Sequence, residues 1–280
     1  MVIQYYSDYS CHCRRMDQRT IHDYYYKPEP IFYGNGKRYF GVELEIDDGG
    51  ESQSNATKIL DIANSGSDLV YIKHDGSLNA GMEIITHPMT LDFHLNHMPW
   101  GAILASAKEM GYRSHASGTC GLHVHLNRIA LGQSDEERDN VIARILYFFE
   151  KHWDELLKFS RRTHRQLQQW ANRYGLKEHP QDILNHAKGN LERYTCVNLT
   201  NYHTIEFRMF RGTLKLNTLI ATLQLLDRIC DVAICLSDSE LKALSWTTFV
   251  RGCSHMPELV QYLKERRLYI NEPVDAEAEV

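Results

Sequence analysis

Three short segments of the chain alternate ionisable and apolar residues, and the ionisable residues are of kinds that bind metals and phosphates. These residues are Glu43 and Glu45 in GVELEI, His123 and His125 in GLHVHL, and Glu206 and Arg208 in TIEFRMF. Successive side chains of a strand point to opposite faces, so each segment would have one apolar and one ionisable face. If the three strands share a sheet, one face collects carboxylates, imidazoles and a guanidinium.

The chemistry of that face is first of all metal and phosphate binding. Carboxylates that alternate on a strand suit a hard cation such as Mg²⁺, which often bridges protein carboxylates and substrate phosphates. The imidazoles also suit Zn²⁺, and Arg208 offers a planar fork of donors for a phosphate. A solvated antiparallel sheet has a polar outer face too, but neighbouring like charges are unfavourable unless a cation lies between them. The pattern therefore favours a functional face.

Two more acidic residues lie between the first and second of these segments. Asp75 stands in a turn, KHDGSL, and Glu83 stands in a strand-like run, GMEIITHP. Aspartate is common in turns for structural reasons alone. A competing hypothesis is a zinc-dependent hydrolase, in which His-x-His, Asp75 and a glutamate hold Zn²⁺ and activate water. In such a hydrolase the Glu43–Glu45 pair and Arg208 would have no obvious function.

The hydrophobic pattern predicts the elements that position these residues. Alternating runs predict strands at 38–47, 69–73, 82–88, 121–127, 194–200 and 203–210. Helical spacing predicts helices at 57–63, 92–110, 134–159 (the longest) and 215–236, with shorter helices after that. Adjacent strands mixed with long helices favour an α+β fold, a mainly antiparallel sheet with helices on one face. A doubly wound sheet is the alternative, but the sequence has no glycine-rich phosphate loop.

The composition is that of an ordinary globular protein. The chain has 280 residues, and 31 basic against 36 acidic residues give a net charge of −5, which argues against nucleic-acid binding. We expect no membrane span, because no apolar run is long enough, and no secretory signal. Seven scattered cysteines suit reduced thiols in the cytoplasm. The oligomeric state stays open, and a homo-oligomer is compatible with the pattern.

The chain divides into three parts by composition. Residues 1–36 form a tyrosine-rich N-terminal arm, residues 37–270 the main domain, and residues 271–280 an acidic, disordered tail. In the arm, Cys11 and Cys13 lie near His12 and His22, which suggests a small zinc site. A structural zinc usually takes two well-spaced pairs of ligands, and no second cysteine pair follows. A plain arm is therefore the favoured interpretation.

Five motifs, taken in order, resemble one family. GVELEI, KHDGSL, GMEIITHP, CGLHVHL and TIEFRMFRGT, between Tyr39 and Thr213, are similar to those of the amidoligases. These are relatives of glutamate–cysteine ligase and glutamine synthetase, which join a carboxylate to an amine with ATP. The resemblance implies a curved antiparallel sheet with the site on its concave face. It also implies an acyl-phosphate intermediate, with ATP as co-substrate and Mg²⁺ or Mn²⁺ as cofactor.

The resemblance also implies roles for individual residues. The implied metal ligands are Glu43, Glu45, Glu83 and Glu206. The implied nucleotide-binding residues are His123, His125, Arg208 and Arg211. The implied catalytic residues are Asp75 for the amine, Glu83 near metal and substrate, and Arg208 for the transferred phosphoryl group. Arg211 has the wrong parity unless the strand ends or bulges before it. The partners would be a small-molecule, peptide or protein carboxylate and an amine; an inactive binding protein of the same fold is a further alternative.

Overall fold

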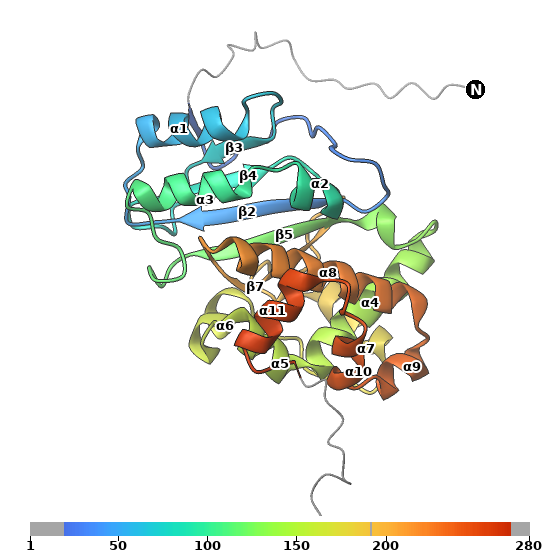
Figure 1. Cartoon of the computed structure of the whole chain (residues 1–280). Helices are drawn as coiled ribbons and strands as arrows, with labels where there is room; N and C mark the ends of the chain where they lie inside the picture. Colours follow the sequence, from blue (N-terminus) through green and yellow to red (C-terminus); the bar gives the residue numbers. More distant parts are fainter. Residues whose placement is uncertain (1–19, 191, 270–280) are drawn as a thin grey trace, which may run out of the picture.

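A mixed sheet of seven strands organises the computed structural model, which describes residues 20–190 and 192–269 (Figure 1). The strands are β1 (Ile21–His22), β2 (Phe40–Ile46), β3 (Val70–Lys73), β4 (Met82–Thr86), β5 (Gly121–Asn127), β6 (Val197–Asn198) and β7 (Thr204–Arg211). Their order is β1-β3-β4-β2-β5-β7-β6, and all neighbours in it are antiparallel except the pair β1–β3. The predicted α+β class is confirmed.

One face of the sheet is mainly apolar and lies under helices. The inward side chains of β2, which are Val42, Leu44 and Ile46, have no exposed surface. The long helices are α1 (Gln53–Ala63), α3 (Trp100–Glu109), α4 (Asp135–Lys151) and α8 (Leu216–Cys235), and Figure 1 shows α1, α3 and α8 on the same side of the sheet. This cover removes the apolar face from water and leaves the ionisable face for a site.

Two predicted helices are each divided in two. The run 92–110 forms α2 (Leu91–Asn96) and α3, because Pro99 has no N–H and cannot continue a helix. The run 134–159 forms α4 and α5 (Trp153–Ser160), with the break at His152. The break directs Phe159 of α5 onto Phe210 of β7, at 5.9 Å between ring centroids. The prediction that 134–159 is the longest helix is wrong, because α8 has 20 residues.

The remaining elements are short. They are the 3₁₀-helix η1 (Arg128–Leu131) and helices α6 (His164–Trp170), α7 (Pro180–Gly189), α9 (Asp238–Ala243), α10 (Trp246–Arg251) and α11 (Pro257–Glu265). The strand predicted at 194–200 is only two residues long, as β6. In the part of the chain that the structure describes, none of these helices or the longer ones combines the length and apolar character that a bilayer crossing requires.

The described part of the N-terminal arm, residues 20–36, lies against the main domain. β1 runs parallel to β3, and Tyr33 forms a bridge with Met89 further along. Of the residues suggested for an arm zinc site, His22 lies in β1, whereas Cys11, His12 and Cys13 lie outside the described residues. The acidic tail at 271–280 also lies outside them.

Candidate active site

Neighbouring strands place the ionisable residues side by side on the open face of the sheet. Three pairs lie directly opposite one another, and these are Glu43–His123, Glu45–Glu83 and His125–Glu206. A further pair places Lys73 of β3 opposite Glu83. The alternation in the sequence thus predicted correctly which side chains share a face, because a strand has a side-chain period of two.

The pairing of β5 with β7 shifts by one residue beside His123. Two residues of β7, Arg208 and Met209, face this single residue of β5, as in a β-bulge. The shift brings Arg211 opposite Gly121, on the parity of the open face. The Arg211 side chain nevertheless lines a separate, smaller cavity.

A pocket of about 1030 Å³ lies over the open face. It is at the upper end of the range of ligand pockets, so it has room for a nucleotide and a second substrate. Its walls include every residue that the sequence suggested except Arg211, namely Glu43, Glu45, Asp75, Glu83, His123, His125, Glu206 and Arg208. Helix α6 contributes Trp170 to the wall, so the helical cover is not confined to the apolar face.

Carboxylates and imidazoles are interleaved in the floor of the pocket. Glu43 Oε1 lies 3.1 Å from His125 Nε2, and Glu43 Oε2 lies 3.7 Å from His123 Nδ1. Glu206 Oε1 lies 3.8 Å from His123 Nδ1 and accepts a hydrogen bond from Arg208 Nη1. Opposite charges therefore hold the floor together when no cation is bound.

The pKa values in this cluster move in opposite directions. Burial opposes ionisation of Glu43 and Glu206, but the charges of His125 and His123 at both carboxylates, with hydrogen bonds from these histidines at Glu43 and the charge of Arg208 at Glu206, together outweigh it. Both carboxyl pKa values are therefore lowered. Burial also opposes protonation of His125, yet the charge of Glu43 raises its pKa. Burial and the charges of Glu43 and Glu45 raise the pKa of Glu83 well above its usual range. The raised pKa values of Glu83 and His125 mean that these residues bind protons where a cation could bind instead.

The donor set fits a divalent cation. Three groups each bring ligand atoms within 4.8 Å of one another, and these are Glu43–His125–Glu206, Glu43–Glu83–His123 and Glu45–Asp75–Glu83. The Nε2 atom of His125 is buried with Glu43 Oε1 as its polar neighbour at 3.1 Å, whereas its Nδ1 lies 3.2 Å from Thr204 Oγ1. If Nδ1 carries the proton, Nε2 presents its lone pair to the floor, as in many metal-binding histidines.

Two buried basic residues of the pocket escaped the sequence interpretation. Arg162, just beyond the end of α5, is buried, and its Nε donates a hydrogen bond of 3.2 Å to the carbonyl of Phe210. Burial, against the attraction of Glu45, lowers the pKa of Arg162 to about 10. Lys73 Nζ lies 4.0 Å from Glu83 Oε2. The alternation of VYIK could have indicated Lys73; the basic stretch Arg161–Lys188 was the only signal for Arg162.

The turn that carries Asp75 is fastened to β2 by a neighbouring aspartate. Asp47, which is fully buried, accepts hydrogen bonds from the backbone N–H groups of Asn79 at 3.1 Å and Ala80 at 2.7 Å. It accepts a third from the Thr119 hydroxyl at 2.8 Å. Within the turn, Asp75 accepts from the N–H of Ser77 at 2.6 Å. The hydrogen bonds of Asp47 therefore fix the position of the turn, and with it Asp75, relative to the floor of the pocket.

Aromatic and basic side chains form one rim of the pocket. Arg193 lies over the rings of Tyr194 at 4.9 Å and Tyr24 at 6.0 Å, and it donates a hydrogen bond to the Tyr24 hydroxyl. Arg208 lies 5.7 Å from the Tyr194 ring. The rim offers flat surfaces on which an aromatic or guanidinium group of a ligand can stack.

Gly121 leaves the space that Arg162 and His123 occupy. A Cβ atom at this position would come within 2.5 Å of Arg162 Nη2 and 2.6 Å of His123 Nε2. We expect Gly121→Ala to displace both side chains and to weaken nucleotide binding on the order of tenfold, the loss of about one good contact. Isothermal titration with Mg–ATP measures this.

The control for that variant is Gly101→Ala, on the surface of α3. A Cβ there would only touch Leu216 Cδ2 at 3.8 Å, and alanine favours a helix over glycine. The control should bind as the wild type does and unfold at a slightly higher temperature. Equal affinities of Gly121→Ala and the control would show that Gly121 and its two neighbours do not affect Mg–ATP binding.

The fold and the site together define an α+β protein whose open sheet face carries clustered carboxylates and imidazoles beside the buried Arg162 and the half-buried Arg208. A family model described as "Putative amidoligase enzyme" matches residues 50–230. The chain belongs to this family, which confirms the resemblance of the motifs. The matched range includes β4, β5 and β7 with their site residues and begins after Glu43 and Glu45.

A search of solved structures finds a bifunctional glutathione synthetase from Pasteurella multocida, with 15% identity and a TM-score of 0.42. The alignment covers 82% of this chain and 46% of that one, so the chain spans about half the length of that protein. No curated protein matches the chain.

Proposed function

We propose that the chain is an ATP-dependent carboxylate–amine ligase that works through an acyl phosphate. One observation carries the proposal: in a member of the amidoligase family, the carboxylate–imidazole floor and the guanidinium groups of Arg162 and Arg208 line the same pocket. We also propose that residues 37–270 act as one catalytic domain with the curved sheet of the glutamine synthetase and glutamate–cysteine ligase type. We place its activity in the cytoplasm.

The floor residues would hold Mg²⁺ or Mn²⁺. The ligands we assign are Glu43, Glu45, Glu83 and Glu206, with His125 Nε2 in addition. When bound, the cations neutralise charge on the phosphates of ATP and align them. His123 and His125 then border the nucleotide, and Arg162 adds a positive charge on the side of β5 away from β2 and β4.

The reaction needs no nucleophile from the protein. An oxygen of the substrate carboxylate attacks the γ-phosphorus of ATP and ADP leaves; the amine then attacks the acyl carbon and phosphate leaves. Arg208 would stabilise the negative charge of the transferred group. Arg208 on β7 would serve the phosphoryl group and Asp75 in the turn beyond β3 would serve the amine, so the two groups would approach the same acyl phosphate from different elements.

The amine would bind at the carboxylate trio Glu45–Asp75–Glu83. Three carboxylates within reach of one point attract an ammonium group as well as a metal. The amine must lose a proton before it attacks, and Asp75 or Glu83 would accept that proton. The acceptor class, whether ammonia, an amino acid, a polyamine or a lysine side chain, is the variable part of the proposal.

A coupled assay for ADP release tests the function. Purified protein is given Mg–ATP with a matrix of carboxylates and amines, and ADP should appear only when both partners are present. ATP binding without turnover in any mixture would indicate an inactive binding protein. Bond hydrolysis that proceeds without ATP would indicate the zinc hydrolase.

Asp75→Asn separates the ligase from the hydrolase. The amide oxygen can still accept from Ser77, so the turn should persist, but the charge that attracts an ammonium is lost. We expect Mg–ATP binding to stay within about twofold of wild type, while the amide formed per ATP consumed falls about tenfold. Metal content and the product-to-ATP ratio are the measurements.

Asp61→Asn, an exposed change on α1, is the matched control and should alter neither quantity. Loss of the metal from Asp75→Asn, together with activity that needs no ATP, would contradict the ligase and favour the hydrolase.

A further inference from the structure

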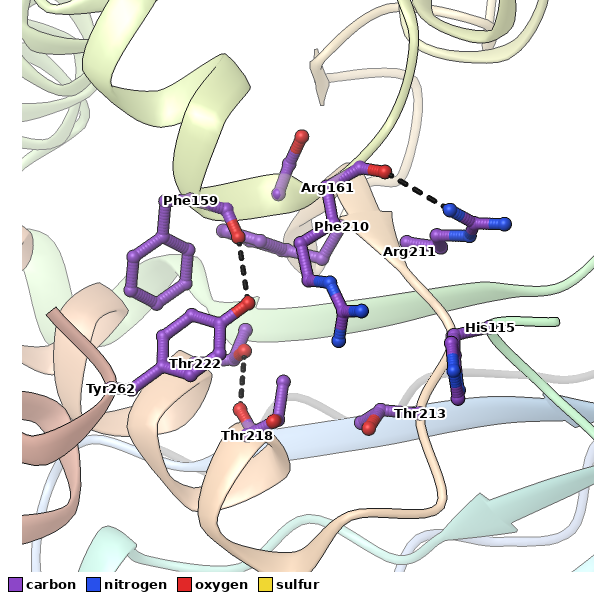
Figure 2. Close-up of a pocket in the computed structure, with 11 residues that line it drawn as sticks. His115, Phe159, Arg161, Phe210, Arg211, Thr213, Thr218, Thr222 and Tyr262 are labelled. Atoms are coloured by element: carbon purple, nitrogen blue, oxygen red, sulfur yellow. Dashed lines mark hydrogen bonds between the residues drawn. The ribbon is translucent and has the colours of Figure 1, made fainter. Parts of the chain in front are cut away.

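A second, smaller cavity lies beyond the end of β7, beside the first turns of α8 (Figure 2). Its walls carry three basic side chains from three different segments, and these are His115, Arg161 and Arg211. Figure 2 shows the Arg161 guanidinium directed toward the space between Thr218 and His115. Arg161 and its neighbour Arg162 thus serve two different cavities, the small one and the large pocket.

The positive charges of this cavity have no counter-ion. Among residues 20–190 and 192–269, no acidic side chain forms an ion pair with Arg161 or Arg211. Glu265 acts on Arg161 from a distance, but its carboxylate binds Lys215 at 2.8 Å. Burial is the largest cause that lowers the pKa of His115, and the positive charges of Arg161 and Arg211 lower it further. The three groups therefore repel one another. Such a cluster is costly unless an anion joins it.

Two polar atoms in the walls also lack partners. The hydroxyl of Thr218, a residue with only 6% of its surface exposed, makes no hydrogen bond, and neither does the buried Nε of Arg211. The neighbouring groups are satisfied: Arg211 Nη1 donates to the carbonyl of Arg161 at 3.3 Å, and Thr222 donates to the carbonyl of Thr218 at 2.8 Å. A buried donor without a protein acceptor can accommodate an oxygen of a ligand or of water.

We infer that this cavity is a binding site for an oxyanion, a carboxylate or phosphate group, held by Arg161, Arg211, His115 and the Thr218 hydroxyl. The enclosed space is about 10 Å³, close to what one water-sized atom occupies. One oxygen of the anion would enter it and meet Thr218, and the rest would stand at the opening, where His115 is exposed. The site is separate from the proposed nucleotide pocket and does not depend on the ligase activity.

A site-specific titration tests the inference without ATP. The imidazole resonances of the full-length protein are followed by NMR while inorganic phosphate, or in a second series acetate, is added. The His115 signal is assigned from its absence in His115→Gln. We expect this signal to shift and saturate with at least one of the two anions. Saturation by phosphate alone identifies a phosphate site, and saturation by acetate identifies a carboxylate site.

Two variants and a control decide the outcome. Arg161→Gln combined with Arg211→Gln, and separately the near-isosteric Thr218→Val, should weaken anion binding about tenfold or more. Lys108→Gln combined with Arg251→Gln changes two exposed residues by the same net charge and should bind as the wild type does. The inference fails if the His115 signal does not saturate with either anion, or if the control weakens binding as much as the Arg161 and Arg211 pair does.

Discussion

Replacing Glu43 and Glu45 together with glutamine should abolish metal-dependent ATP binding and leave the protein folded. Losing a residue that merely supports a metal ligand costs about 10–100-fold in metal affinity, so losing two direct ligands should exceed a hundredfold. The fold should survive because glutamine has the same shape. Its amide oxygen can still accept the Gly121 N–H bond that Glu45 accepts, and the charges that raise the pKa of Glu83 are removed.

Calorimetric titration with Mn–ATP measures this effect, and circular dichroism during heating monitors the fold. Glu109→Gln combined with Glu136→Gln alters two exposed glutamates and is the matched control. An unchanged ATP affinity in the folded double variant would show that β2 does not carry the metal site.

Arg208→Lys should lower turnover about a hundredfold, close to 3 kcal/mol of transition-state stabilisation, although it keeps the charge. The guanidinium does two things at once in the structure: one terminal nitrogen binds Glu206, and the plane faces the Tyr194 ring. Its Nε is buried without a partner and remains free to donate to a phosphoryl oxygen. A lysine ammonium cannot keep the Glu206 bond and reach that oxygen in the same geometry.

The rate of ADP release under saturating substrates reports this loss, and Mg–ATP affinity should change far less than the rate. Arg193→Lys makes the same substitution at the exposed rim and should retain most activity. Turnover close to wild type in Arg208→Lys would show that Arg208 only positions Glu206 and does not stabilise the transferred group.

The sequence predicted the floor of the site well and its walls poorly. The floor follows from local pattern, because alternation fixes the face of each side chain in β2, β5 and β7 once the strands pair. The same rule applies to Lys73 in β3, which was not used. Arg162 comes from the end of a helix, and its burial arises only when α5 packs against β7. No local period encodes such a contact.

The helix boundaries show the same difference between local signals, which can be predicted from sequence, and long-range contacts, which cannot. Pro99 is a visible stop signal, so the break between α2 and α3 could have been predicted. His152 is not a breaker by type. The break there accompanies the packing of Phe159 on Phe210, a contact between residues far apart in sequence. The apolar stripe of 134–159 continues through the break, and therefore spacing alone predicted one helix.

The bulge beside His123 determines which residues of β7 face the two cavities, so both cavities depend on the length of β7. The extra residue in β7 shifts the alternation of side chains by one position. Glu206, before the bulge, and Arg211, after it, therefore both have the parity of the open face of the sheet. Deletion of Arg208 or Met209 would remove the bulge: Phe210 would still face Leu122 and Arg211 would still face Gly121, but only one side chain of β7 would remain opposite His123. Insertions and deletions in β7 are therefore not neutral changes of length, whereas the exposed turn at Tyr202 can absorb them without altering which residues face the ligands.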